Sequence, residues 1–185
     1  MGDWFQTIVD RDASEADSPE LSTAILTWLV SEGIVSPNRC DCVFGEGGYP
    51  PGPHYAKAVE DPDDRLFKLR TNGLKITTTR TMFHCGQLGA HPVCSSCSNR
   101  FDVSDEWGDE WGKAVGEWYE KRGPGLLACP RCNHIEAITE WEHDPAFGFG
   151  NLGFEFWNWP FFTSRFLQEI GKCLEHRVLL VEGKS

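Results

Sequence analysis

The first part of the chain has the pattern of a strand followed by an amphipathic helix. Apolar and polar residues alternate over Asp3–Val9, which predicts a strand. Ser18 and Pro19 then supply a hydroxyl cap and a proline suited to the first helical position. Apolar residues recur at helical spacing from Leu21, and Gly33 is placed to end the helix in the left-handed conformation. We expect this helix to bury one face.

The last part of the chain has the pattern strand–helix–strand. A strongly aromatic strand is predicted over Asn151–Trp159, where a change of phase predicts a bulge or burial on both faces. A helix beginning at Thr163 or Ser164 follows and has Cys173 on its apolar face. The apolar run His176–Glu182 predicts a closing strand.

The middle of the chain predicts a loop and a hairpin. Gly45–Pro53 holds four glycines and three prolines, which predicts a loop without regular structure, either a surface connection or a binding loop. Over Arg65–Arg80, apolar and polar residues alternate on both sides of Asn72 and Gly73, a dipeptide typical of a type I′ turn. This predicted hairpin carries five cations and no carboxylate.

Together these segments predict an α+β fold, with helices packed on one face of an antiparallel or mixed sheet. The chain has 185 residues, and its 40% hydrophobic content includes eight Trp and twelve Phe. That apolar surface can offset the entropy of ordering, so global disorder is excluded. The length suits one domain, or one domain with a small inserted module.

The strongest chemical signal is a pair of C-x-x-C motifs, Cys94/Cys97 and Cys129/Cys132. Each two-residue spacer lets both thiolates point at one ion from a tight turn, and zinc favours four such ligands in a tetrahedron. Because four thiolates close the coordination shell and leave no position for an activated water, the expected Zn²⁺ is structural.

This pattern resembles a zinc ribbon, in which two cysteine knuckles on β-hairpins face each other. The resemblance implies an inserted zinc-ribbon-like module over residues 82–138, with residues 1–81 and 139–185 forming an α+β body. The spacer between the pairs, residues 98–128, has 31 residues, against roughly 15–20 in the usual spacing. A helix predicted over Asp105–Lys121 fills it, and a strand is predicted over Ile135–Trp141.

Disulfides and redox chemistry are the alternative uses of these cysteines. Disulfides are disfavoured in the cytoplasm, and neither pair opens a helix after a strand as a thioredoxin-type motif does. His84, Cys85 and His91 lie just upstream and are candidates to replace one ligand, although the two C-x-x-C pairs already complete a site.

The helix predicted in the spacer carries tryptophans on one side and carboxylates on the other. Either the tryptophans pack on the body and the acidic side faces solvent, or the helix presents an acidic surface with aromatic edges to a basic protein. The residues assigned to this partner surface are Trp107, Asp109, Glu110, Trp111 and Trp118.

The net charge of −11 bears on partners and location. It disfavours nucleic acid and anionic membrane, since each phosphate contact needs a cation, and it favours a basic protein. The chain begins without a signal-peptide pattern, and its longest mostly apolar stretch, Ala24–Val35, falls short of the roughly 20 residues that span a bilayer. A cytoplasmic location is therefore expected.

The sequence carries no familiar catalytic motif, so we expect a non-catalytic, zinc-stabilised, protein-binding protein. A concrete example is a bacterial immunity or antitoxin-type protein that blocks a basic toxin domain. Two alternatives stay open. One is a nucleic-acid-associated zinc-ribbon protein that uses the cations of Arg65–Arg80, and the other is an enzyme with a site near His54 or His143.

Overall fold

A computed structural model describes residues 2–86, 89, 91–103 and 108–185. The helices of this part of the chain are α1 (Ser18–Ser31), α2 (Gly108–Tyr119) and α3 (Ser164–Leu174), with the short 3-10 helices η1 (Tyr55–Lys57) and η2 (Asp64–Lys68). The strands are β1 (Trp4–Asp10), β2 (Cys40–Val43), β3 (Glu46–Gly48), β4 (Leu74–Thr77), β5 (Thr81–Phe83), β6 (Pro92–Val93), β7 (Leu126–Ala128), β8 (Ile135–Ala137), β9 (Glu142–His143), β10 (Gly148–Gly150), β11 (Leu152–Trp157) and β12 (Val178–Lys184).

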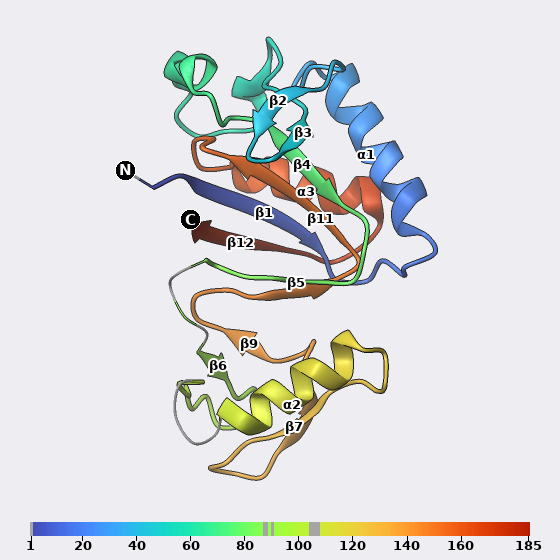
Figure 1. The fold of residues 1–185 in the computed structure, drawn as a ribbon, viewed down its shortest axis with the longest axis vertical. Coiled ribbons are helices and arrows are strands. Elements are labelled where there is room, and N and C mark those ends of the chain that lie inside the picture. The colour runs from blue at the N-terminus through green and yellow to red at the C-terminus, as the bar shows by residue number, and fades with distance from the viewer. Residues whose placement is uncertain (1, 87–88, 90, 104–107) are drawn as a thin grey trace.

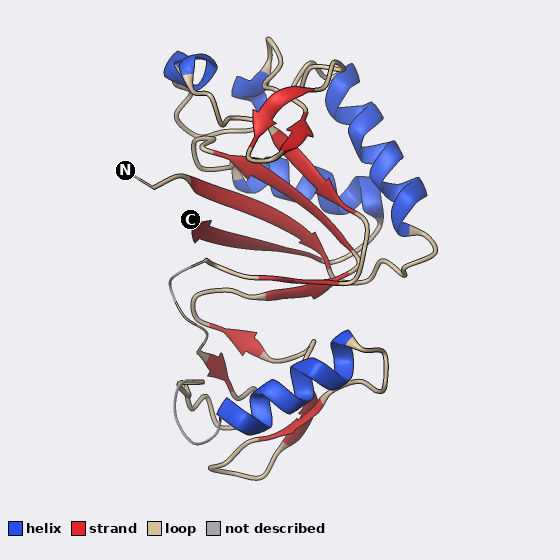
Figure 2. Ribbon diagram, viewed as in Figure 1, coloured by secondary structure: helices blue, strands red, loops and turns tan. Residues whose placement is uncertain are grey.

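The predicted α+β class is confirmed, and its centre is a four-stranded antiparallel sheet in the order β12-β1-β11-β4 (Figure 1). Along the chain, the strands of this sheet and two helices follow the sequence β1–α1–β4–β11–α3–β12. This is the split β-α-β arrangement of ferredoxin-like folds, in which the first and third strands lie at the centre. Helices α1 and α3 pack on one face of the sheet, as predicted (Figure 2).

The main hydrophobic core lies between the sheet and these two helices. Phe154 and Phe156 of β11 and Ile8 of β1 are fully buried in it. The ring of Phe156 packs edge to face on Trp159 and Phe162, with centroids 5.0 and 4.9 Å apart. Aromatic pairs in this geometry add to the stabilisation that burial alone provides.

One fully buried polar side chain, Gln6 of β1, is hydrogen-bonded at both ends of its amide. Its Nε2 donates to the carbonyl oxygens of Trp159 and Pro160 at 3.3 and 3.0 Å, and its Oε1 accepts from the Phe162 amide at 3.3 Å. Because a buried amide without partners would be costly, these three bonds fix the segment that leads from β11 into α3.

The predicted starts of α1 and α3 agree with the structure to within one residue, whereas the helix predicted over Asp105–Lys121 ends two residues earlier, at Tyr119, and its predicted start lies outside the described residues. Asp17, not Ser18, is the N-cap of α1, and Gly33 follows the helix with a φ of +70°. Thr163 caps α3, its Oγ1 accepting from the Phe166 amide at 3.1 Å.

The prediction that Cys173 lies in the core is wrong, because its side chain is exposed. The buried residues of α3 are Phe166, Ile170 and Leu174. Cys173 borders an open groove between α1 and α3, which Trp28 also lines, so no neighbouring element covers the thiol.

The hairpin predicted over Arg65–Arg80 does not form. Its first part is η2, where the Asp63 side chain caps the turn, and β4 pairs with β11 instead of with the preceding segment. The amides of Asn72 and Gly73 donate to the Cys42 carbonyl at 3.0 and 2.9 Å, which holds this dipeptide against β2. The alternation of residues in this stretch was thus a misleading signal.

The prediction of a loop throughout Gly45–Pro53 is also wrong, because the segment contains β3, which pairs with β2. A Cβ atom added at Gly48 would lie 2.4 Å from Val43 Cγ2. Glycine therefore permits the close approach of the two strands here. From the sequence alone, the glycines of this segment predict a loop.

The β4–β11 ladder continues beyond the sheet as the β5–β10 pair, which leads towards the cysteine-bearing end of the molecule (Figure 1). Gly153 pairs with Thr77 and Gly150 with Thr81, so one extra residue lies on the β4–β5 side. This irregularity bends the ladder. The register of β11 against β1 is unbroken, so the strand itself has no bulge; Phe156 is buried on one face and Trp157 is half-buried on the other.

A second hydrophobic core surrounds the cysteines at that end. Its buried members are Cys94, Ala114, Trp118, Leu127, Cys129, Ile138, Trp141 and Phe149. Phe149 belongs to β10, so this core extends into the segment that returns to the sheet. The division of the chain at residues 82 and 138 stays a prediction.

Replacing Thr163 with alanine removes the hydroxyl that caps α3, so Thr163→Ala should lower the free energy of unfolding by about 1 kcal/mol. Ser164→Ala is the control, because Ser164 is exposed and is not the cap. Urea denaturation of both variants followed by circular dichroism checks this, and equal midpoints for the two variants would contradict it.

Candidate metal centre

The four cysteines of the two C-x-x-C motifs lie together. The Sγ atoms of Cys94 and Cys132 are 3.7 Å apart, those of Cys97 and Cys129 are also 3.7 Å apart, and all four lie within 4.8 Å of one another. Four sulfurs at tetrahedral corners about 2.3 Å from one ion would be about 3.8 Å apart. The spacing therefore fits a metal-binding cluster.

Two turns of matching geometry position the sulfurs. In the first, the Cys94 amide donates to the Asn99 carbonyl at 3.0 Å and the Ser98 amide to the Cys94 carbonyl at 2.8 Å. In the second, the Cys129 amide donates to the His134 carbonyl at 2.8 Å and the residue after Cys132 donates to the Cys129 carbonyl at 2.9 Å.

The residue after each C-x-x-C adopts a left-handed backbone. The φ angles are +54° at Ser98 and +60° at Asn133. Asparagine tolerates this conformation and serine adopts it less readily, so the backbone accepts local strain where it turns both sulfurs towards one point.

The electrostatics of the cluster favour a cation. Hydrogen bonding from the His134 amide lowers the pKa of the Cys132 thiol to about 7. The Asn99 amide lowers the pKa of Cys97, but burial and the neighbouring thiols outweigh it and raise that pKa to about 11. Four adjacent thiolates repel one another, and a divalent ion at their centre would stabilise all of them in the charged form.

Burial separates the two cysteines of each pair. Cys94 and Cys129 are buried in the second core, whereas Cys97 is half-buried and Cys132 is exposed. The cluster thus lies at the edge of the second core, with one cysteine of each pair in the apolar interior. A metal bound there would hold the hydrophobic core together as well as the two turns.

The upstream candidates do not join the cluster. In the described part of the chain, the four cysteines are the group of His, Cys, Asp and Glu side chains close enough to share an ion. The thiol of Cys85 is buried and donates to the Gly89 carbonyl at 3.1 Å, and His84 Nδ1 accepts from the Gly86 amide at 3.0 Å.

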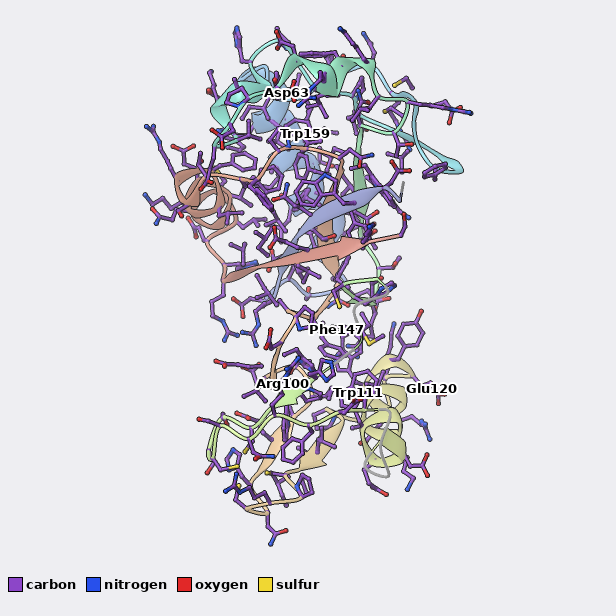
Figure 3. All side chains as sticks on the ribbon, turned by 90° about the vertical axis from the view of Figure 1, so that its left-hand side faces the viewer. Asp63, Arg100, Trp111, Glu120, Phe147 and Trp159 are labelled. Atoms are coloured by element: carbon purple, nitrogen blue, oxygen red, sulfur yellow. The ribbon has the colours of Figure 1, made fainter. Side chains whose placement is uncertain are left out.

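Of the five residues assigned to a partner surface, the four described ones have different surroundings in the structure. Asp109 and Glu110 are exposed at the start of α2. Trp118 is buried, its ring packed on Phe149 at 5.1 Å, so it belongs to the second core and not to the surface. Trp111 is half-buried and points towards Phe147 in the interior (Figure 3). Trp107 lies outside the described residues.

His143, at the end of β9, is half-buried by its neighbours. Its ring lies 5.6 Å from that of Phe147 and 5.9 Å from that of Phe149, beside a cavity of about 250 Å³, and both ring nitrogens are shielded from solvent. Burial lowers its pKa from 6.5 to about 4. The sequence offered no signal for this burial, because β9 has only two residues.

The folded protein therefore favours neutral His143, and acid should destabilise the fold. The unfolded chain binds the proton more readily, so stability is lost as pH falls from 6.5 towards 4 and is unaffected above that range. The loss should reach up to about 3 kcal/mol. His143→Phe should remove this part of the pH dependence, whereas the exposed control His54→Phe should keep it. Urea midpoints at about pH 7 and about pH 5 test this, and parallel curves for both variants would refute it.

Comparison with protein-family models, curated proteins and solved structures finds no match to this chain. Among the helices that the structure describes, none has the length and apolar character needed to cross a bilayer. The chemistry of the site therefore rests on the geometry of the four cysteines, which fits a bound metal ion.

Proposed function

We propose that this protein is a non-catalytic, protein-binding protein in which Cys94, Cys97, Cys129 and Cys132 hold a structural Zn²⁺ within a zinc-ribbon-like module. Sulfur spacing near that of a tetrahedron supports the metal, and four sulfur ligands suit zinc or iron. The closed shell of four thiolates supports a structural role, since a catalytic zinc keeps a position for water.

The observation that carries the binding role is the outward side of α2. Asp109, Glu110 and Glu120 are exposed there, and neighbouring Tyr119 is 57% exposed. Glu120 lies on the side of α2 turned away from the rest of the molecule (Figure 3). Two of the carboxylates pair with nearby exposed cations, contacts that contribute little and exchange readily.

A basic protein is the partner that this surface suits. Opposite charge raises association rates, and an exposed aromatic ring supplies apolar contact. The metal bears on this surface indirectly: Ala114 and Trp118 anchor α2 in the same core as Cys94 and Cys129. A bacterial immunity or antitoxin-type protein that blocks a basic toxin domain is the concrete form of this proposal.

The alternatives gain less support. The nucleic-acid alternative relied on the cations of Arg65–Arg80, but Arg65 and Arg70 pair with carboxylates at 2.6 and 3.8 Å, and Arg80 donates to the Trp118 carbonyl. The enzyme alternative relied on two histidines. His143 faces aromatic rings, and His54 is exposed, with Nδ1 3.2 Å from a backbone carbonyl oxygen.

Elemental analysis of the purified protein should find one zinc per chain. Cys129→Ser should abolish most zinc binding and the near-ultraviolet signal of the module's tryptophans, because metal-binding energy here is folding energy. Cys173→Ser, an exposed thiol on α3, should change neither. A metal-free chain with an undiminished tryptophan signal would contradict the metal assignment.

Reversing charge on α2 should weaken partner binding. Asp109→Lys combined with Glu110→Lys should reduce affinity for a basic partner recovered from the native host about tenfold, mainly through slower association. Glu60→Lys combined with Asp61→Lys makes the same charge change on two adjacent exposed carboxylates between η1 and η2 and is the control. Interferometry at low and high salt measures both. Recovery of no protein partner, or equal losses for both pairs of substitutions, would refute the proposal.

A further inference from the structure

A cavity of about 410 Å³ lies where the start of β1, the segment around η2 and the chain just after β11 meet. A volume of this size lies within the usual range for small-molecule sites. Figure 3 labels two residues that line the cavity, Asp63 and Trp159, in the upper part of the molecule, whereas Trp111 of α2 lies in the lower part. The cavity is therefore separate from α2 and from the cysteine-bearing end.

Hydrogen bonds between distant segments hold the walls of this cavity in place. Asn158 Oδ1 accepts from the Trp4 amide at 3.1 Å, which joins the start of β1 to the end of β11. Trp159 Nε1 donates to the Asn72 carbonyl at 2.7 Å, and Asn72 Nδ2 donates to the Leu66 carbonyl at 2.9 Å. The fold thus forms the cavity without a ligand, which lowers the entropic cost of binding one.

The interior of the cavity is apolar and aromatic. Trp159 is fully buried and Leu66 is nearly so, and these two side chains form its base. The walls include Trp4, which is half-buried, and Leu69, which is 45% exposed. The Trp4 ring packs edge to face on Phe161 at 5.1 Å, a contact that holds the ring in position. Among aromatic side chains, tryptophan attracts a cation most strongly.

The rim of the cavity carries two carboxylates and one cation. Asp63 is paired with Arg65 at 2.6 Å, whereas the carboxylate of Asp61 forms no hydrogen bond or ion pair with any described residue. Lys68 is the other cation of residues 60–68, a segment that holds four carboxylates. One negative charge at the rim therefore stays without a counterion, and a positive charge beside Asp61 is favoured.

We propose that this cavity binds a small organic cation of the quaternary ammonium class. The charged head lies against the Trp4 ring and beside the Asp61 carboxylate, and its methyl groups contact Leu69. A cation with N–H groups would lose hydrogen bonds to water on entering an apolar cavity, whereas a quaternary ammonium ion has none to lose. The site does not depend on the protein-binding role of α2.

The test uses choline as the probe and its uncharged isostere 3,3-dimethylbutan-1-ol as the counterpart, each titrated into the full-length protein by calorimetry at constant ionic strength. Choline should bind saturably with one site per chain. The alcohol has the same shape without the charge and should bind about tenfold more weakly. Phosphocholine separates a free cation from a lipid headgroup, and it should bind about tenfold more weakly than choline because the rim carboxylates repel its phosphate.

Asp61→Asn keeps the shape of the side chain and removes its charge, so it should weaken choline binding about tenfold. Because Asp61 is exposed, this variant leaves the packing intact. Glu60→Gln is the matched control, since Glu60 is an exposed carboxylate of the same segment that does not line the cavity, and it should leave the affinity unchanged. Trp4→Leu removes the ring and should weaken choline about fivefold. If Trp4→Leu fails to fold, Asp61→Asn still decides.

The proposal is overturned if choline shows no saturable binding, if the alcohol or phosphocholine binds as tightly as choline, or if Asp61→Asn and Glu60→Gln give the same affinity. Failure here leaves the role of α2 unaffected, because the cavity and α2 lie in different parts of the molecule (Figure 3).

Discussion

The alternation of side chains along β11 is the constraint on which the rest of the molecule depends. Phe154 and Phe156 are fully buried against the helices, and because successive residues of a strand point to opposite faces, Gly153, Glu155 and Trp157 must point the other way. One strand therefore completes the main core and also forms part of the second face of the sheet. Its continuation through β10 delivers Phe149 to the second core, so the cysteine-bearing end is tied to the same strand.

The second core has fewer buried residues than the main core. Two of its buried members, Cys94 and Cys129, are also members of the metal cluster. A small core provides little hydrophobic stabilisation, and a metal held by four thiolates would add folding free energy to it. Burial of one sulfur from each pair connects the metal directly to the packing beneath α2.

The distribution of charge follows from which cations contact other side chains of the protein. Arg80 packs over the Trp118 ring at 4.8 Å, while Arg177 forms ion pairs with Asp12. The outward side of α2 keeps its carboxylates next to solvent. The exposed carboxylates of α2 thus hold part of the net charge of −11 on one surface.

The sequence by itself determined the local features. Thr163 caps α3 because a hydroxyl satisfies an unpaired amide, Gly33 follows α1 because it accepts a positive φ, and the C-x-x-C spacing brings two sulfurs into each turn. These outcomes depend on neighbours a few residues apart, which is why their pattern is visible along the chain.

Only the tertiary structure decided which strands pair and which side chains are covered. Arg65–Arg80 alternates like a hairpin, but β4 pairs with β11, which lies far away in sequence and whose Phe154 and Phe156 are fully buried. Cys173 was expected in the core and is exposed, whereas Trp118 was assigned to a partner surface and is buried. Whether a side chain is buried depends on elements from distant parts of the chain, and local periodicity does not predict which of these elements will pack against it.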